Sequence, residues 1–357
     1  MAEKSWLDEN PERLARKAEC MGPIKEAVKA SAAMAQTELP LEGRIQGKVR
    51  DIYDLPNGHL MLVATDRQSA FDRILAAVPF KGQVLNMTAA WWFKKTESIV
   101  PNGLVCVPDP NCTVASKVEV FPVEFVVRGY ITGSTDTSLW THYKNGARTY
   151  CGIPFPDGLV KNQKLEANVV TPTTKAEHGD APMSPEDLVK NGYITKEDYD
   201  YCAEKALAVF KCGQEESAKR GLILVDTKFE FGKDANGKIF LIDEVLTPDS
   251  SRYWAAATFE ERLREGKEPE NFDKEFLRLW FKSPEANCDP YKDEKLPEAP
   301  ASLVEELSWR YICIYEMITG DKFSFPPLSP LPHERIVTNA TKAKDAATKG
   351  ELSSLSC

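Results

Sequence analysis

Residues 221–245 read GLILVDTKFEFGKDANGKIFLIDEV and contain two apolar segments separated by a polar turn. The segments 221–231 and 238–245 are rich in Ile, Leu, Val and Phe. Between them, residues 234–237 have the Asp, Asn and Gly content of a tight turn. This pattern predicts an antiparallel β-hairpin.

Charged residues interrupt this apolar hairpin. Alternation places Asp226, Lys228 and Glu230 on one face of the first strand, and Asp243 and Glu244 follow on the second. Carboxylates on adjacent strands come within reach of one ion, and such oxygen ligands suit Mg²⁺, which usually also takes substrate phosphates. The alternative is a solvated face of ion pairs. The apolar neighbours favour a functional site, because buried charges are costly without a role.

The rest of the chain mixes hairpins with helical runs. Strands are predicted at 48–55, 60–64 and 118–131, and the long segment 151–185 is predicted to be loop. Helices are predicted at 1–38, 82–99, 196–219, 272–281 and 302–318. Antiparallel hairpins and helices in separate runs predict an α+β fold rather than a doubly wound sheet.

The length and composition predict two lobes with an extension at each end. Residues 1–40 are assigned to an N-terminal helical extension, 41–120 to an N-terminal lobe, and 121–325 to a C-terminal lobe that includes C-terminal helices. The tail 326–357, rich first in Pro and then in Lys, Ala, Thr and Ser, is predicted to be mostly disordered. For the first extension, an oligomerisation element is the alternative to a plain extension, so a homo-oligomer is compatible with the sequence.

Composition excludes several classes of protein. The formal net charge is -9, whereas nucleic-acid binders are normally basic. The nine cysteines form no CxxC pair, which argues against disulfides and structural zinc. No apolar run would span a bilayer, and the N-terminus resembles no targeting peptide. We therefore expect a cytoplasmic protein without nucleic-acid or membrane partners, or a plastid protein if a transit segment precedes this sequence.

Two segments place basic residues beside small or hydroxyl residues, as phosphate sites do. Residues 43–51 hold Gly47 and Lys48 at the start of a hairpin, where glycine lets the backbone approach a phosphate. A plain turn is about as well supported, since the segment lacks the Walker and kinase glycine patterns. After the strand 118–131, Arg128 and Ser134 offer a clamp for phosphate or carboxylate, and an ordinary strand exit is the alternative.

Two further polar segments follow apolar strands, a usual location for a site. Residues 247–254 contain Asp249 and Arg252 among hydroxyl residues, and residues 65–73 contain Ser69 and Asp72. The residues alone thus predict an enzyme with a phosphate-rich, Mg²⁺-dependent site and do not name its substrate.

Taken together and in order, these segments resemble the SAICAR synthetase family in its single-function plant or bacterial form. The resemblance covers about residues 43–320 and rests on the stretches GKVRDIYD, TDRQSAFDR, PFKGQVLN, FPVEFVVRGYITGS, VDTKFEFG and IDEVLTPDSSRYW. Further matches are GLVKNQKL, TPTTKAEHGD and DKEFLRLWF.

The resemblance implies a two-lobed fold related to ATP-grasp enzymes and protein kinases, with ATP between the lobes. In this fold, residues 41–120 would be the ATP-binding lobe and residues 121–325 the substrate and Mg²⁺ lobe. It also implies a ligase of purine biosynthesis, which converts ATP, L-aspartate and carboxyaminoimidazole ribotide (CAIR) into ADP, phosphate and the succinocarboxamide ribotide (SAICAR). Phosphorylation would turn the unreactive CAIR carboxylate into an acyl phosphate that accepts the aspartate amine. The implied small-molecule partners are these three substrates, and the implied cofactor is Mg²⁺.

The resemblance also implies roles for individual residues. The catalytic set is Lys48, Lys228 and Asp226. The ATP-binding set is Gly47, Lys48, Val49, Arg50, Lys117, Glu230 and Asp243. The substrate-binding set is Ser69, Asp72, Arg128, Ser134, Asp249 and Arg252. Glu230 and Asp243 are the implied Mg²⁺ ligands.

Two rival functions share the same broad fold. A kinase-like phosphotransferase is disfavoured because the chain contains neither an HRD nor a DFG pattern. A nucleotide-binding regulatory module without turnover is disfavoured because Lys48, Lys228, Glu230 and Asp243 are all present.

Overall fold

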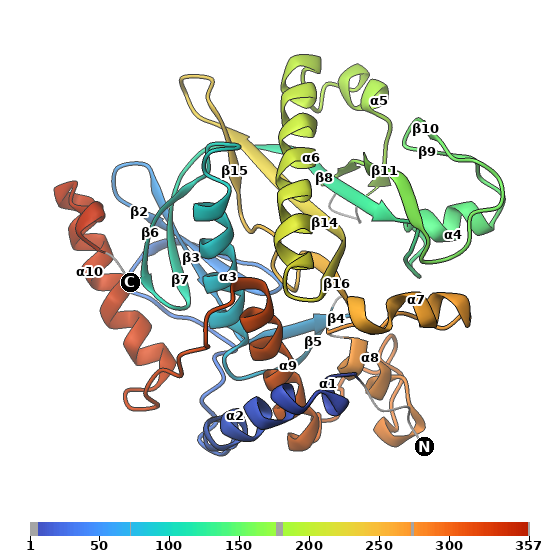
Figure 1. Cartoon of the computed structure of the whole chain (residues 1–357). Helices are drawn as coiled ribbons and strands as arrows, with labels where there is room; N and C mark the ends of the chain where they lie inside the picture. Colours follow the sequence, from blue (N-terminus) through green and yellow to red (C-terminus); the bar gives the residue numbers. More distant parts are fainter. Residues whose placement is uncertain (1–5, 72, 176–180, 273–274, 356–357) are drawn as a thin grey trace. The chain divides into compact units, whose positions relative to one another are not determined.

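The chain divides into two compact units, and each is described by itself. Unit 1 comprises Met1–Trp91, Leu104–Lys117 and Phe272–Cys357, and unit 2 comprises Trp92–Gly103 and Val118–Asn271. The structure is a computed structural model that describes residues 6–71, 73–175, 181–272 and 275–355 (Figure 1). The predicted lobes are each continuous in sequence. The two units are not, because the C-terminal helices belong to unit 1.

Unit 1 is built on a five-stranded antiparallel sheet with the order β1-β2-β3-β7-β6. Its strands are β1 Glu42–Gln46, β2 Arg50–Leu55, β3 His59–Ala64, β6 Leu104–Asp109 and β7 Cys112–Ser116. The predicted hairpin around residues 56–58 is β2 and β3, which pair from Arg50–Ala64 to Leu55–His59. A separate two-stranded ribbon consists of β4 Arg67–Ala70 and β5 Arg73–Ala77.

Helices of unit 1 come from both ends of the chain. They are α1 Trp6–Glu9, α2 Pro11–Lys29, α8 Glu275–Phe281, α9 Ala301–Thr319 and α10 Pro332–Lys349, with short 3-10 turns at Pro284–Ala286 and Leu352–Ser354. α2 packs against α9, and Arg16 of α2 pairs with Glu316 of α9 at 2.7 Å. α3, Lys81–Lys95, contributes its first residues to unit 1 and its last to unit 2.

The prediction of a mostly disordered tail is wrong for α10. This helix buries Ile336 and four alanines, including Ala340 and Ala343, in the same core as Tyr53 and Val114 of the sheet. Figure 1 shows α10 beside the sheet, in contact with β6. Composition is misleading here because alanine presents little apolar surface, yet its small side chain lets a helix approach a sheet closely.

Unit 2 contains a seven-stranded sheet whose main path is β13-β12-β8-β14-β15. β11 also pairs with β8, and β16 with β14. The strands are β8 Glu119–Tyr130, β11 Lys164–Val170, β12 Thr173–Thr174, β13 Ala181–Pro182, β14 Leu222–Lys233, β15 Ile239–Ile242 and β16 Ser251–Ala255. The predicted hairpin is confirmed as β14 and β15. The predicted loop 151–185 is corrected in part, because β11 lies within it.

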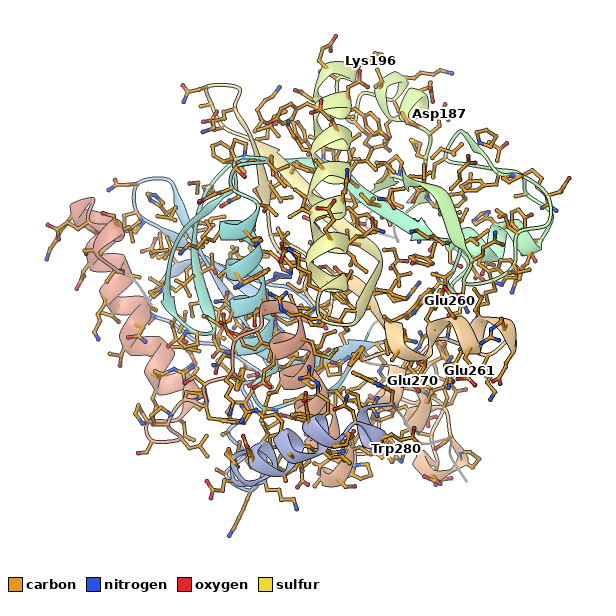
Figure 2. All side chains as sticks on the ribbon, in the orientation of Figure 1. Asp187, Lys196, Glu260, Glu261, Glu270 and Trp280 are labelled. Carbon is orange, nitrogen blue, oxygen red and sulfur yellow. The ribbon has the colours of Figure 1, made fainter. Side chains whose placement is uncertain are left out.

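The helices of unit 2 are α4 Leu139–Lys144, α5 Pro185–Lys190, α6 Lys196–Ala218 and α7 Ala256–Arg264, and a small hairpin joins β9 Thr149–Tyr150 to β10 Ile153–Pro154. α6 lies against β14 and β8, and it starts at Lys196 (Figure 2), where the Thr195 side chain caps it. Gly213 allows this close packing, since a Cβ there would lie 2.6 Å from Leu246 and 2.7 Å from Leu224.

The mixed content of helices and antiparallel strands agrees with the predicted α+β class. Of the predicted helices, 196–219 and 302–318 match α6 and α9 closely, and 82–99 corresponds to α3. Within the described ranges no helix is both long and apolar enough to cross a membrane.

Candidate functional site

The predicted site residues fall into two groups, one in each unit. In unit 2 the central element is β14, which pairs with β8 and with β16. Charged residues of these three strands lie on one face of the sheet. Asp226, Lys228 and Glu230 occupy alternate positions of this strand and therefore share one of its faces, as predicted. The sheet register therefore decides which charged residues they meet.

Lys228 lies between two buried carboxylates. Its Nζ is 2.5 Å from Glu124 of β8 and 2.8 Å from Glu230, which faces Glu124 directly in the register. Glu230 also pairs with Lys175, and Thr173 donates a hydrogen bond to Glu124 at 3.0 Å. We call these four charged residues, Glu124, Lys175, Lys228 and Glu230, the lysine–carboxylate network.

The network favours the charged forms of Lys228 and Glu230. Burial opposes the charge on Lys228, but the nearby Glu230 and Glu124 carboxylates outweigh burial and raise the pKa of Lys228. Burial likewise opposes ionisation of Glu230, yet Lys228 and Lys175 outweigh it and lower the pKa of Glu230. The ion pairs therefore hold both Lys228 and Glu230 in their charged forms.

A second charged set lies further along the same strand. Asp226 faces Arg128 of β8 and Arg252 of β16 in the register, and its carboxylate is 3.5 Å from Arg128 and 3.0 Å from Arg252. Arg128 also donates from Nε to Thr171 at 2.9 Å. Both guanidinium groups are thus oriented by one carboxylate, and each has further N–H donors of the kind that bind phosphate.

The remaining predicted residues of unit 2 lie at strand ends. Ser134 is exposed in the loop after β8, and Asp249 lies in the turn before β16. Asp243 comes one residue after β15 ends and adopts a positive φ of 65°. It follows Ile242, the residue paired with Glu230, so the chain brings the two predicted metal ligands to the same end of the hairpin.

The sequence analysis assigned no role to Glu124 or Lys175. Glu124 is 5% exposed within the apolar strand β8, and a charge in such a strand is the same signal that singled out Lys228. Lys175 follows the short strand β12 inside a segment predicted to be loop. Only the pairing of β12, β8 and β14 shows that both residues meet Glu230.

Fit to Mg²⁺ can be judged from the donor chemistry. Glu230 and Asp243 are oxygen donors, as Mg²⁺ prefers, and Glu230 already holds two cationic groups. Among the described residues no three His, Cys, Asp or Glu side chains form a metal-binding group. Two carboxylates suit an ion that takes its other ligands from phosphates and water, and they do not form an all-protein cage.

In unit 1, Gly47, Lys48, Val49 and Arg50 form the turn between β1 and β2. Gly47 donates its N–H to the Arg50 carbonyl at 2.7 Å, and a Cβ on Gly47 would lie 2.8 Å from that oxygen. The turn thus needs glycine for its tight closure. Lys48 is exposed at its tip, as a phosphate-binding lysine must be.

Three other predictions concern unit 1. Ser69 lies half-buried on β4, and Asp72 falls outside the described residues. Lys117 follows β7 and is 56% exposed, and its Nζ pairs with Asp54 at 2.6 Å. An exposed pair of this kind contributes little to stability, so Lys117 can exchange its partner readily.

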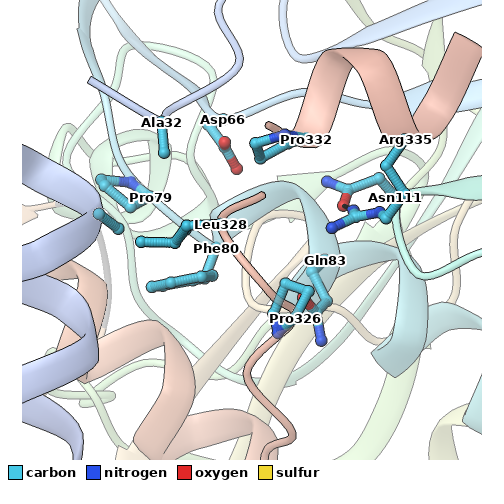
Figure 3. Close-up of a pocket in the computed structure, with 11 residues that line it drawn as sticks. Ala32, Asp66, Pro79, Phe80, Gln83, Asn111, Pro326, Leu328, Pro332 and Arg335 are labelled. Atoms are coloured by element: carbon cyan, nitrogen blue, oxygen red, sulfur yellow. Dashed lines mark hydrogen bonds between the residues drawn. The ribbon is translucent and has the colours of Figure 1, made fainter. Parts of the chain in front are cut away.

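Asp66 is a buried carboxyl that the predictions did not single out. It lies beside a small cavity also lined by Gln83 and Arg335 (Figure 3). Its oxygens accept hydrogen bonds from the backbone N–H groups of Met34 at 2.7 Å and Gly82 at 2.8 Å. Burial dominates, and it raises the pKa of Asp66 to about 6.

Comparison with known proteins identifies a family. A model of the SAICAR synthetase family matches residues 44–294. The chain is 56% identical to the chloroplastic phosphoribosylaminoimidazole-succinocarboxamide synthase of Arabidopsis thaliana over 92% of this chain and 80% of that protein. It resembles the solved SAICAR synthase from Saccharomyces cerevisiae complexed with SAICAR, with 33% identity, a TM-score of 0.70, and coverage of 82% of this chain and 100% of that one. A SAICAR synthetase in complex with ADP gives 25% identity, a TM-score of 0.60, and coverage of 79% and 100%.

Proposed function

This chain belongs to the SAICAR synthetase family of purine-biosynthesis ligases, and we propose that it converts ATP, L-aspartate and CAIR into ADP, phosphate and SAICAR. The yeast relative was solved with SAICAR and another relative with ADP, a reaction product and a nucleotide that this scheme requires. A relation of the fold to ATP-grasp enzymes and protein kinases is a further proposal, and it rests on the sequence resemblance.

The observation that carries the proposal is the charged face of β14. Lys228 bridges Glu124 and Glu230, and Asp226, on the same strand as Lys228, orients Arg128 of β8 and Arg252 of β16. Buried charges on a sheet are retained at a cost, which a site for highly charged ligands would explain. ATP, a ribotide monophosphate and two carboxylate-bearing substrates are such ligands.

We assign the ribotide phosphate to the two arginines. Arg128 and Arg252 share the single carboxylate of Asp226 and keep donors for phosphate oxygens. The exposed Ser134 hydroxyl would complete this phosphate site, and Asp249 would contact the ribotide. Asp226 then acts by orienting the arginines, a different role from direct catalysis beside Lys228.

Glu230 and Asp243 are the proposed holders of Mg²⁺. When bound, the ion would offset negative charge on the nucleotide phosphates. Glu230 must then release a lysine. Lys175, whose side chain is 34% exposed, can turn toward a phosphate, while Lys228 keeps Glu124 as its partner.

The chemistry proceeds through two bond exchanges. A carboxylate oxygen of CAIR attacks the γ-phosphorus of ATP, and the bond to the ADP oxygen breaks. The aspartate amine then attacks the acyl carbon, the carbon–oxygen bond to phosphate breaks, and the nitrogen loses a proton. Lys228 would stabilise the charge at the reacting carboxylate or phosphate, and Lys48 in the 47–50 turn would bind ATP phosphates.

The remaining assignments are also proposals. Lys117 and its backbone neighbours would contact the adenine, and Ser69 and Asp72 would hold the imidazole. The compartment is the cytoplasm, with the chloroplast as the alternative that the Arabidopsis relative's name supports. The existence of a homo-oligomer stays a prediction.

The test is release of ADP by the purified chain with Mg²⁺, ATP, CAIR and L-aspartate, leaving out one substrate at a time. We expect release only with all three substrates, and a product with the mass of SAICAR. Release without aspartate would point to a phosphotransferase instead. Binding of ATP without any release would favour a regulatory module.

A further inference from the structure

Arg67 is a fully buried cation beneath the turn between β1 and β2. Its exposed fraction is 0%, and its guanidinium makes four hydrogen bonds. Nε donates to the Lys48 carbonyl at 3.1 Å, and Nη2 donates to the Gly47 carbonyl at 3.0 Å. Nη1 donates to the Ala35 carbonyl at 2.9 Å, and Nη2 also reaches Asp51 at 2.6 Å. Two successive carbonyls of the turn are therefore held by one side chain.

The next carbonyl of the turn is held from the same segment. Val49 accepts from the backbone N–H of Thr65 at 2.9 Å and from the Thr65 hydroxyl at 2.7 Å. In a trans peptide the N–H points opposite to the C=O. Because the Gly47 and Lys48 carbonyls point at Arg67, the N–H groups of Lys48 and Val49 are directed to the opposite side of the backbone.

An arginine is required for this arrangement. Its planar fork can reach several acceptors at once, whereas the ammonium of lysine is a single point donor. The pair with Asp51, itself 0% exposed, offsets the cost of burying the charge. Asp51 is held in turn by Thr37, whose hydroxyl is 2.5 Å away.

We propose that Arg67 is a positioning residue, which fixes the backbone of the 47–50 turn so that Lys48 and the adjacent amides are presented to the phosphates of ATP. This inference rests on the proposed function of the turn. Arg67 is fully buried and holds the turn carbonyls, so we expect it to act through the turn. Its loss should weaken nucleotide binding selectively, beyond any loss of stability.

The test compares Arg67→Lys with Arg335→Lys. The control also replaces an arginine of unit 1 that pairs with a fully buried carboxylate, Asp109 at 2.9 Å, and its hydrogen bonds go to Asp109 and Asn111 rather than to the turn. We expect Arg67→Lys to raise KM for ATP and Kd for MgADP by about 10- to 100-fold, the size of effect that misplacement of a binding group produces. KM for CAIR and for aspartate should change less than about twofold, and the control should leave nucleotide affinity unchanged.

A second readout needs no nucleotide. Trypsin cleaves after Lys48 only when the turn can leave its folded geometry, so Arg67→Lys should accelerate this cleavage about tenfold, while Arg335→Lys should not. If Arg67→Lys does not fold, Thr65→Val removes one bond to the Val49 carbonyl without touching the buried ion pair, and it should show the same changes in weaker form.

The outcomes separate the two proposals. Equal losses of nucleotide affinity in Arg67→Lys and Arg335→Lys, or an unchanged KM for ATP with an unchanged cleavage rate, would overturn the positioning role. Unchanged cleavage and KM for ATP in Thr65→Val would do the same. A wild-type chain that neither binds MgADP nor releases ADP would overturn the function proposed for the turn, whereas the cleavage rates would still report whether Arg67 holds it.

Discussion

Replacing Arg335 with leucine tests how firmly α10 is attached to the sheet of unit 1. Arg335 makes a two-bond pair with Asp109 of β6, at 2.9 Å from Nε and 3.2 Å from Nη2. Asp109 also accepts from the Asn339 side chain at 2.9 Å and from the Asn111 backbone at 2.9 Å. Leucine retains an aliphatic group in place of the arginine stem and removes the guanidinium charge.

The magnitude follows from the burial of the two partners. Breaking a buried ion pair costs about 3–5 kcal/mol, because the remaining charge loses its partner. The Asp109 side chain is 0% exposed, but the Arg335 side chain is 16% exposed and Asp109 keeps two donors. We therefore expect Arg335→Leu to lower the free energy of unfolding of unit 1 by about 3 kcal/mol, at the lower end of this range.

The assay is hydrogen exchange of β6 and α10 amides across a urea series, which reports the opening free energy of unit 1 rather than of the whole chain. The double variant Asp109→Asn with Arg335→Leu should be about 1.5 kcal/mol more stable than Arg335→Leu alone, because no buried charge is then left unpaired. Lys342→Leu, at an exposed position of α10, should change stability by less than about 0.5 kcal/mol.

A change below about 0.5 kcal/mol for Arg335→Leu would refute the calculation, since that is the range of an ordinary surface substitution. The calculation would also be contradicted if the stability losses of Arg335→Leu and Asp109→Asn simply added in the double variant. In either case the buried pair would not be what holds α10.

Three further predictions concern the carboxylates Asp66, Glu124 and Asp243. Asp66 has its pKa raised to about 6 from an ordinary 3.8, so its stabilising contribution is complete below pH 3.8 and is lost as pH rises through 6. The stability of wild type relative to Asp66→Asn should therefore fall by about 2 kcal/mol between pH 4 and 7 in urea titrations, and a constant difference would contradict this. Glu124→Gln removes one of the two carboxylates that pair with Lys228, and steady-state ADP release should slow about tenfold or more; an unchanged rate would exclude Glu124 from the site. Asp243→Asn should lower kcat about 100-fold or more while circular dichroism stays unchanged, and near wild-type kcat at saturating Mg²⁺ would remove Asp243 from the proposed metal site.

Local patterns in the sequence were sufficient for much of the fold. The hairpins β2–β3 and β14–β15 follow from apolar segments around short turns, because both signals act over a few residues. The shared face of Asp226, Lys228 and Glu230 also follows from alternation alone. The family was evident as well, since several motifs in order are far more specific than any one of them.

Tertiary structure decided the partners of these residues. Packing over the whole unit sets which strand lies beside β14 and in which register. Only the placement of β8 and β12 therefore shows that Glu124 and Lys175 belong to the lysine–carboxylate network. Arg67 and Asp51, 16 positions apart, likewise meet only in the folded unit. The helix α10 shows the same limit, because its alanine face gains burial only against the sheet, and a composition that counts apolar residues locally cannot register that contact.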